Sequence, residues 1–172
     1  MSPVVKSTII AFMILLVPAV SSAIERFPAE YFSFSIETTV KGSPEEVFET
    51  ITGDISGWWD HSFSKTPLKL YVDPFPGGAF MEIFDEEGHG VRHAVVTAAE
   101  YGKMLRYEGP LGLAGTALLM VTTWSLKGAE EGQTIVTVEV HGSGEVGDGI
   151  PEILEKTWGY FLNDRLKPHL EK

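Results

Sequence analysis

Residues 150–170 read IPEILEKTWGYFLNDRLKPHL, and this stretch decides the fold. Large apolar side chains recur every four residues along it, at positions 150, 154, 158, 162, 166 and 170. Ile153, Thr157 and Phe161 lie beside that stripe. A stripe of this width predicts a long amphipathic helix that buries a whole face. Pro151, which follows the glycine-rich loop 142–149, suits the first turn of such a helix.

From about residue 66 to this helix, the chain changes to the period of two that is typical of strands. Turn segments at 74–78, 86–90, 101–103 and 127–132 separate the alternating segments. Strands are predicted at 67–72, 78–85, 90–99, 103–109, 116–127 and 133–141. Successive hairpins of this kind predict an antiparallel meander.

The preceding segment predicts one more strand and two short helices. Residues 31–40 alternate between apolar and polar side chains, which indicates a half-buried strand. Ser43-Pro44-Glu45-Glu46 then has the pattern of a capped helix start. A second short helix is expected at 55–59. The predicted architecture is therefore α+β, with a seven-stranded curved antiparallel sheet wrapped around the long helix, and a cavity between the two.

Composition excludes several classes of protein. The chain has 172 residues, 44% of them hydrophobic, which is too apolar for a disordered chain. Its formal net charge of −11 argues against nucleic-acid binding, because phosphate backbones repel an acidic protein. It has no cysteine, so disulfides, thiolate metal sites and a cysteine nucleophile are excluded.

Residues 1–23 have the pattern of a cleaved secretory signal peptide. Lys6 precedes an apolar run from Ile9 to Val20, and Ser21-Ser22-Ala23 supplies small residues for cleavage. The alternative is a membrane anchor, but twelve residues span only ~18 Å as a helix, against a ~30 Å bilayer core. The expected mature protein is residues 24–172, a single domain that is periplasmic or secreted and has no stable membrane span.

The order of these elements resembles that of the START-like or SRPBCC superfamily, which includes birch-pollen-type allergens, polyketide cyclases and activators of the heat-shock-protein-90 ATPase. The likeness covers about residues 31–170 and is strongest to bacterial SRPBCC-domain proteins. The local stretches that carry it are SPEEVF at 43–48, WWD at 58–60, GGAFME at 77–82, GKMLR at 102–106, GPLG at 109–112 and LK at 166–167. The resemblance implies an α+β helix-grip fold and a hydrophobic cavity for a small molecule. It does not fix the function, since the fold hosts carriers, receptors, cyclases and co-chaperones.

Polar residues on an apolar strand face are the main candidates for chemistry. A hairpin around residues 85–90, in which paired residue numbers sum to 175, places Glu82 opposite His93. The next hairpin, with a sum near 203, places Thr97 opposite Arg106 on the same face. Glu82, His93 and Arg106 are therefore expected to cluster inside the cavity, where they would orient a ligand or transfer protons. The alternative is a satisfied polar island in the core, and a one-residue register shift would disperse the cluster.

Several large apolar residues are candidates for the cavity wall, with ordinary core packing as the alternative for each. They are Trp58, Trp59, Phe80, Phe84, Met120, Trp124, Trp158 and Phe161. Trp58 and Trp59 are adjacent and cannot both point the same way, so one of them is expected at the cavity mouth.

Other chemistries have weak support. His89 and His93 have the HxxxH spacing of a helical metal site, but Gly90 indicates a hairpin instead. The glycines at 77–78 and 142–149 do not match a phosphate-binding loop. No metal and no cofactor is expected, and no catalytic residue can be assigned.

Three functions remain. The first is an exported protein that binds a small apolar or amphipathic molecule. The second is a cyclase, dehydratase or hydrolase that uses the same cavity. The third is a protein-binding module related to the chaperone activators, with an unknown partner.

Overall fold

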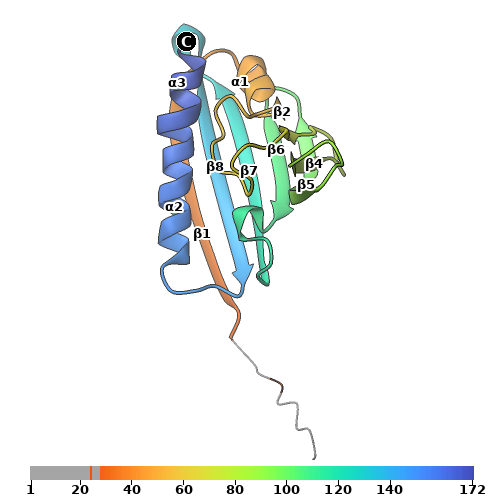
Figure 1. The fold of residues 1–172 in the computed structure, drawn as a ribbon. Helices are drawn as coiled ribbons and strands as arrows, with labels where there is room; N and C mark the ends of the chain where they lie inside the picture. The colour runs from red at the N-terminus through yellow and green to blue at the C-terminus, as the bar shows by residue number, and fades with distance from the viewer. Residues whose placement is uncertain (1–23, 25–27) are drawn as a thin grey trace, which may run out of the picture.

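The long helix and the sheet that it covers dominate the computed structural model, which describes residue 24 and residues 28–172 (Figure 1). The strands are β1 (Glu30–Lys41), β2 (Gly53–Asp54), β3 (Lys69–Val72), β4 (Ala79–Ile83), β5 (Gly90–Glu100), β6 (Met104–Gly109), β7 (Leu118–Gly128) and β8 (Gln133–Gly144). The helices are α1 (Pro44–Thr50), α2 (Ile150–Tyr160) and α3 (Lys167–Leu170), with short helical segments η1 (Leu111–Leu113), η2 (Glu130–Gly132) and η3 (Phe161–Leu166). The predicted signal peptide lies outside the described residues.

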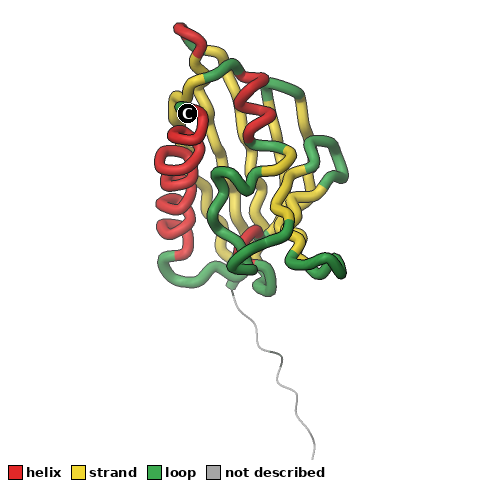
Figure 2. The backbone as a smooth tube through the Cα atoms, turned by 45° about the horizontal axis from the view of Figure 1, so that its top comes forward, coloured by secondary structure: helices red, strands yellow, loops and turns green. Residues whose placement is uncertain are grey.

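One antiparallel sheet contains all the strands of the described residues, in the order β1-β8-β7-β6-β5-β4-β3-β2. Consecutive hairpins build it from β2 to β8, and β1 pairs with β8 along its whole length. The predicted α+β architecture is confirmed. Between β2 and β3, residues 55–68 lie over the same face of the sheet as the long helix (Figures 1 and 2).

The sheet has eight strands and not seven, and the second short helix expected at 55–59 is absent. Gly53 has a φ of 62°, a left-handed conformation that ends the helical path, and β2 then pairs with β3. Ile55 accepts backbone hydrogen bonds from Trp58 and Trp59, so this segment makes a single turn. The first helix is confirmed: Ser43 and Glu46 form a reciprocal capping box at the start of α1.

The long helix is continuous but not uniform. In an ordinary α-helix, residues four apart drift by ~40° around the axis at each step, so a long stripe would wind off the sheet. Here η3 is a π-helical segment, in which Lys167 N–H bonds to the carbonyl five residues earlier. Its wider turn reverses the drift and keeps Trp158, Leu162 and Leu166 buried on one face. Pro168, two residues after η3, has no N–H for an ordinary α-helical bond.

Two β-bulges in β5 correct the predicted registers. Phe80 pairs with Ala94 but Met81 pairs with Arg92, so His93 is an extra residue without a partner. In the same way Thr97 is extra opposite β6. Glu82 therefore pairs with Val91 and not with His93, and β4 ends at Ile83, before Phe84.

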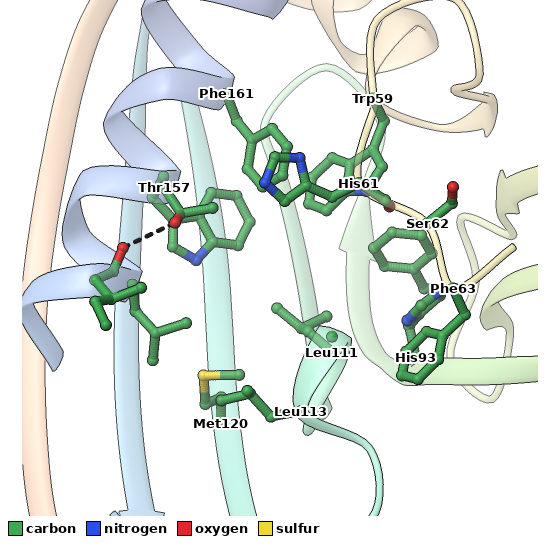
Figure 3. Close-up of a pocket in the computed structure, with 15 residues that line it drawn as sticks. Trp59, His61, Ser62, Phe63, His93, Leu111, Leu113, Met120, Thr157 and Phe161 are labelled. Carbon is green, nitrogen blue, oxygen red and sulfur yellow. Dashed lines mark hydrogen bonds between the residues drawn. The ribbon is translucent and has the colours of Figure 1, made fainter. Parts of the chain in front are cut away.

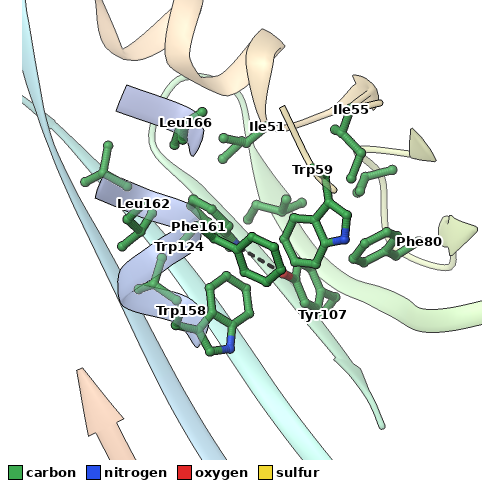
Figure 4. Packing of buried hydrophobic residues seen from close by; sticks show 14 of the residues in the cluster. Ile51, Ile55, Trp59, Phe80, Tyr107, Trp124, Trp158, Phe161, Leu162 and Leu166 are labelled. Carbon is green, nitrogen blue, oxygen red and sulfur yellow. Dashed lines mark hydrogen bonds between the residues drawn. The ribbon is translucent and has the colours of Figure 1, made fainter. Parts of the chain in front are cut away.

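The core is an aromatic cluster between the helix and the sheet (Figure 4). Trp59 stacks on Phe161 with ring centroids 4.0 Å apart and meets Phe80 and Trp158 edge to face. Trp124 Nε1 donates to the buried hydroxyl of Tyr107 at 3.1 Å, which satisfies both polar groups. Burial raises the pKa of Tyr107, an effect that this hydrogen bond partly offsets.

Candidate functional site

A cavity of about 500 Å³ opens between α2 and the sheet (Figure 3). Phe80, His93 and Met120 contribute its sheet wall, and η1 closes one side with Leu111 and Leu113. The helix wall consists of Ile153, Leu154, Thr157, Trp158 and Phe161. Trp59, His61, Ser62 and Phe63 come from the long loop, which we call the rim loop (residues 59–64). Most of these side chains are apolar, and Phe63 and Ile153 at the mouth are 51% and 57% exposed.

Glu82 is the main polar group beneath the rim loop. It is 0% exposed, and all three of its hydrogen bonds come from nitrogen donors. Phe63 N–H donates to Oε2 at 2.9 Å, Ser64 N–H donates to Oε1 at 2.8 Å, and His93 Nε2 lies 3.0 Å from Oε2. A carboxylate is an acceptor only, so this arrangement fits the ionised form.

The electrostatics of Glu82 agree with that geometry. Burial by itself would raise the pKa of Glu82, because it disfavours the charged form. The hydrogen bonds from Ser64, Phe63 and His93 outweigh burial, and the pKa lies below its ordinary value. Glu82 thus fixes Phe63 and Ser64, at the C-terminal end of the rim loop, to the sheet.

His93 reaches Glu82 because of the bulge at this point in β5. In a regular strand one of two consecutive residues faces away from the core, yet His93 and Ala94 are both buried. The bulge turns His93 inward and leaves the residue 4% exposed at the cavity wall. Gly109 permits this close approach of β5 and β6, since a Cβ there would overlap the carbonyl oxygen of His93.

Asp60 fixes the other end of the rim loop to the long helix. Its Oδ2 accepts from Tyr160 Oη at 2.6 Å and lies 3.1 Å from Arg165 Nε, while Oδ1 lies 2.9 Å from His61 Nδ1. Burial raises the pKa of Asp60, but the contacts with Tyr160, His61 and Arg165 outweigh it, so the pKa is lowered overall. His61 and Ser62 are therefore held between two anchors.

No known protein-family model matches this chain, and no curated protein matches its sequence. Solved structures do match. The Mll3558 protein from Rhizobium loti has a TM-score of 0.62 at 21% sequence identity, over 84% of this chain and 100% of that one. The Aha1 dimer from Colwellia psychrerythraea has a TM-score of 0.54 at 22% identity, over 81% and 96% of the two chains. DynU16, from the dynemicin biosynthetic locus, has a TM-score of 0.52 at 19% identity, over 81% of this chain and 47% of that one.

The chain has the helix-grip fold. This confirms the fold expected from the resemblance to the START-like or SRPBCC superfamily, and identities this low show the fold alone.

The helix-grip cavity brings together six of the residues singled out in the sequence: Trp59, Phe80, His93, Met120, Trp158 and Phe161. Glu82 lies behind His93 and contacts the cavity through it. Trp58 and Trp124 are buried in the core; Trp58 Nε1 donates to the carbonyl oxygen of Thr50 at the end of α1. Of the two adjacent tryptophans, Trp59 is the one at the cavity.

The placement of Arg106 and Phe84 in the cavity was wrong. Arg106 alternates with the buried Leu105 and Tyr107, so it points to the outer face, where its Nε donates to Thr123 Oγ1 at 3.0 Å. The bulge at Thr97 moved the register that had placed Arg106 inside. Phe84 lies beyond the end of β4 and is not among the residues that line the helix-grip cavity.

The rim loop and η1 are parts of the site that the sequence pattern did not predict. His61, Ser62, Phe63, Leu111 and Leu113 belong to irregular segments, where periodicity carries no signal. Ile153, Leu154 and Thr157 were recognised as helix positions but not as cavity wall. One usable signal was the run of polar and aromatic residues that follows Trp59.

The described residues were compared with the requirements of a metal site and of a membrane-spanning helix. Among the described residues, one group of potential ligands lies close together: Asp85, Glu87 and His89, at the exposed β4–β5 turn. His89 bonds to Asp85 there, whereas His93 faces Glu82 in the core, so the HxxxH spacing does not act as a helical pair. No helix in the described part of the chain is long and apolar enough to cross a membrane.

Proposed function

We propose that this protein is exported and binds a small apolar or amphipathic molecule in the helix-grip cavity. The observation that carries the proposal is an open cavity of about 500 Å³ with mainly apolar walls and a few fixed polar side chains. Its volume lies in the range of pockets that hold small-molecule ligands. Its walls come from the helix, the sheet, the rim loop and η1, so the site depends on the whole fold.

Apolar contact would supply most of the affinity. A ligand that buries about 300 Å² of its own apolar surface gains roughly 7 kcal/mol, before the costs of association. The aromatic rings of Trp59, Trp158 and Phe161 hold one another in place by edge-to-face and stacked contacts, so little ordering is needed on binding. The structural likeness to DynU16 supports a role with small molecules, because that protein comes from a biosynthetic locus.

Native mass spectrometry of residues 24–172, purified from the native host, tests ligand binding. A reproducible added mass that is released on denaturation would support the proposal and identify the ligand class. The paired variants Ile153→Asp and Leu119→Asp locate the site. Both residues are exposed, but Ile153 lines the cavity and Leu119 lies on the outer face of β7. We expect Ile153→Asp to reduce the bound fraction at least tenfold, because a carboxylate opposes an apolar ligand. Equal binding by the two variants would refute the cavity as the site.

Export has its own test. Replacing Ile14 by Arg places a charge in the apolar run of residues 9–20, which should block signal recognition. We expect the variant to stay in the cytoplasm with residues 1–23 attached, as shown by cell fractionation and intact mass. Unchanged export would refute the signal-peptide proposal.

A second candidate function is proton-transfer catalysis of the cyclase, dehydratase or hydrolase kind. Two carboxylate–histidine pairs favour it, because His61 and His93 line the cavity and contact Asp60 and Glu82 behind them. Such pairs are suitable general acids or bases. Incubation of the recovered ligand with fresh protein distinguishes the two functions: a binding protein returns it unchanged, and an enzyme converts it or its precursor.

A further inference from the structure

The two hydroxyl and two imidazole side chains that line the cavity share one property: each directs its own hydrogen into the protein. Thr157 Oγ1 donates to the Ile153 carbonyl oxygen at 2.8 Å, as the dashed line in Figure 3 shows. Ser62 Oγ donates to the Ser64 carbonyl oxygen. His61 and His93 each face a carboxylate, which can only accept, so the ring nitrogen at that contact carries the hydrogen.

The consequence is clearest at His93, because its ring is buried. Glu82 fixes the proton of the neutral imidazole on Nε2, which leaves Nδ1 as a bare acceptor. Nδ1 has no hydrogen-bond partner among the described residues, and the ring lines the cavity. An acceptor that a bound ligand shields from water without replacing the hydrogen bond costs about 1–3 kcal/mol, so Nδ1 favours a ligand that can donate to it.

The charges around the cavity also favour a ligand with a neutral donor. No lysine or arginine is among the described residues that line it. The negative charges of Glu82 and Asp60 lie directly behind the two histidines. An anionic ligand group would therefore meet no lysine or arginine, and the neutral indole N–H of Trp158 would be its available side-chain donor.

We infer that the cavity selects apolar molecules that carry a neutral hydrogen-bond donor, such as an alcohol hydroxyl, and that His93 Nδ1 accepts this hydrogen bond. The inference rests on the proposed binding function and names its ligand class. It also gives Glu82 a role as a positioning residue, which sets the tautomer of His93 without touching the ligand.

Three probes with the same aromatic body test the inference: 1-pyrenemethanol, 1-(methoxymethyl)pyrene and 1-pyrenecarboxylate. Their affinities are measured by pyrene fluorescence at pH 9, above the range in which imidazole ordinarily titrates. We expect the alcohol to bind three- to tenfold more tightly than the ether, which cannot donate, and the carboxylate to bind most weakly. Binding of none of the three would count against the proposed function itself. Equal binding of alcohol and ether would overturn only the present inference.

Two variants assign the preference to a residue. His93→Phe keeps an aromatic ring but removes the acceptor, so the ratio between alcohol and ether should fall to about one. Thr157→Val is the matched control, because it removes another cavity oxygen at nearly constant shape, and it should keep the wild-type ratio. Loss of the preference in Thr157→Val instead would overturn the assignment to His93.

A measurement on the wild-type protein does not depend on any variant folding. Nitrogen-15 NMR of the His93 imidazole distinguishes a protonated ring nitrogen from a bare one. We expect Nε2 to be protonated and Nδ1 to be bare at pH 9. The opposite tautomer would overturn the inference.

Discussion

Replacing Glu82 by Gln should destabilise the protein, although the two side chains have nearly the same shape. The carboxylate accepts from Phe63 N–H, Ser64 N–H and His93 Nε2. An amide has one acceptor oxygen and one NH₂ group. If the NH₂ group takes the Oε1 position, it faces the Ser64 N–H, donor to donor. If it takes the Oε2 position, it faces the Phe63 N–H in the same way. Each orientation therefore leaves a buried N–H without an acceptor.

The magnitude follows from that count. One buried donor left unsatisfied costs about 1–3 kcal/mol, and the remaining bonds lose the added strength of a charged acceptor. Removal of a buried charge offsets part of this loss, because the charge no longer has to be desolvated. We expect a net loss of about 2 kcal/mol in the free energy of unfolding, which lowers Tm by roughly 4–8 °C in a domain of this size.

Thermal and urea unfolding at pH 7 and pH 3 measure the effect, with Glu86→Gln as the exposed control in the same hairpin. The folded-state pKa of Glu82 is lowered, so its contribution is present above the unfolded value near 4.5 and is lost as pH falls through the folded value. The difference between wild type and Glu82→Gln should therefore shrink at pH 3. A Tm equal to that of wild type at pH 7, or a difference that does not change with pH, would refute the reasoning.

Two further substitutions probe the strands and the core. Gly109→Ala should lower the free energy of unfolding by more than about 2 kcal/mol in urea titrations, because its Cβ would overlap the His93 carbonyl oxygen. Gly112→Ala is the control: a Cβ there has nothing within 4 Å, so its free energy of unfolding should stay within about 0.5 kcal/mol of wild type. Trp124→Phe should cost about 2–3 kcal/mol by calorimetry, because it leaves a void and removes the donor to the Tyr107 hydroxyl; a change below 0.5 kcal/mol would contradict this.

The long helix, the hairpins and the first capped helix could be predicted because each rests on a local pattern. The four-residue stripe, the period of two and the Ser43–Glu46 capping box need no knowledge of distant contacts. The sheet meander follows from short turns, which leave antiparallel pairing as the only route. Gly53-Asp54 was missed because two residues are too few to show a period.

The site was harder to predict because two bulges in β5 break the counting on which cross-strand pairing depends. The Glu82–His93 contact was predicted from the wrong register, and it exists because the bulge at His93 turns that residue inward. The same kind of irregularity at Thr97 removed Arg106 from the cluster. A bulge depends on how neighbouring strands meet in three dimensions, and alternation along one strand carries little trace of it.

The two anchors of the rim loop also set how far the cavity can widen. Asp60 is tied to the helix and Phe63 to the sheet, and the three peptide units between them span at most ~11 Å. A ligand too large for the cavity would have to push the helix and the sheet apart. The short segment between the two anchors would oppose this movement, because it is held at both ends. The affinity for a series of larger ligands would then fall in one step, at the ligand width at which the first anchoring hydrogen bond breaks. It would not fall gradually with each added atom.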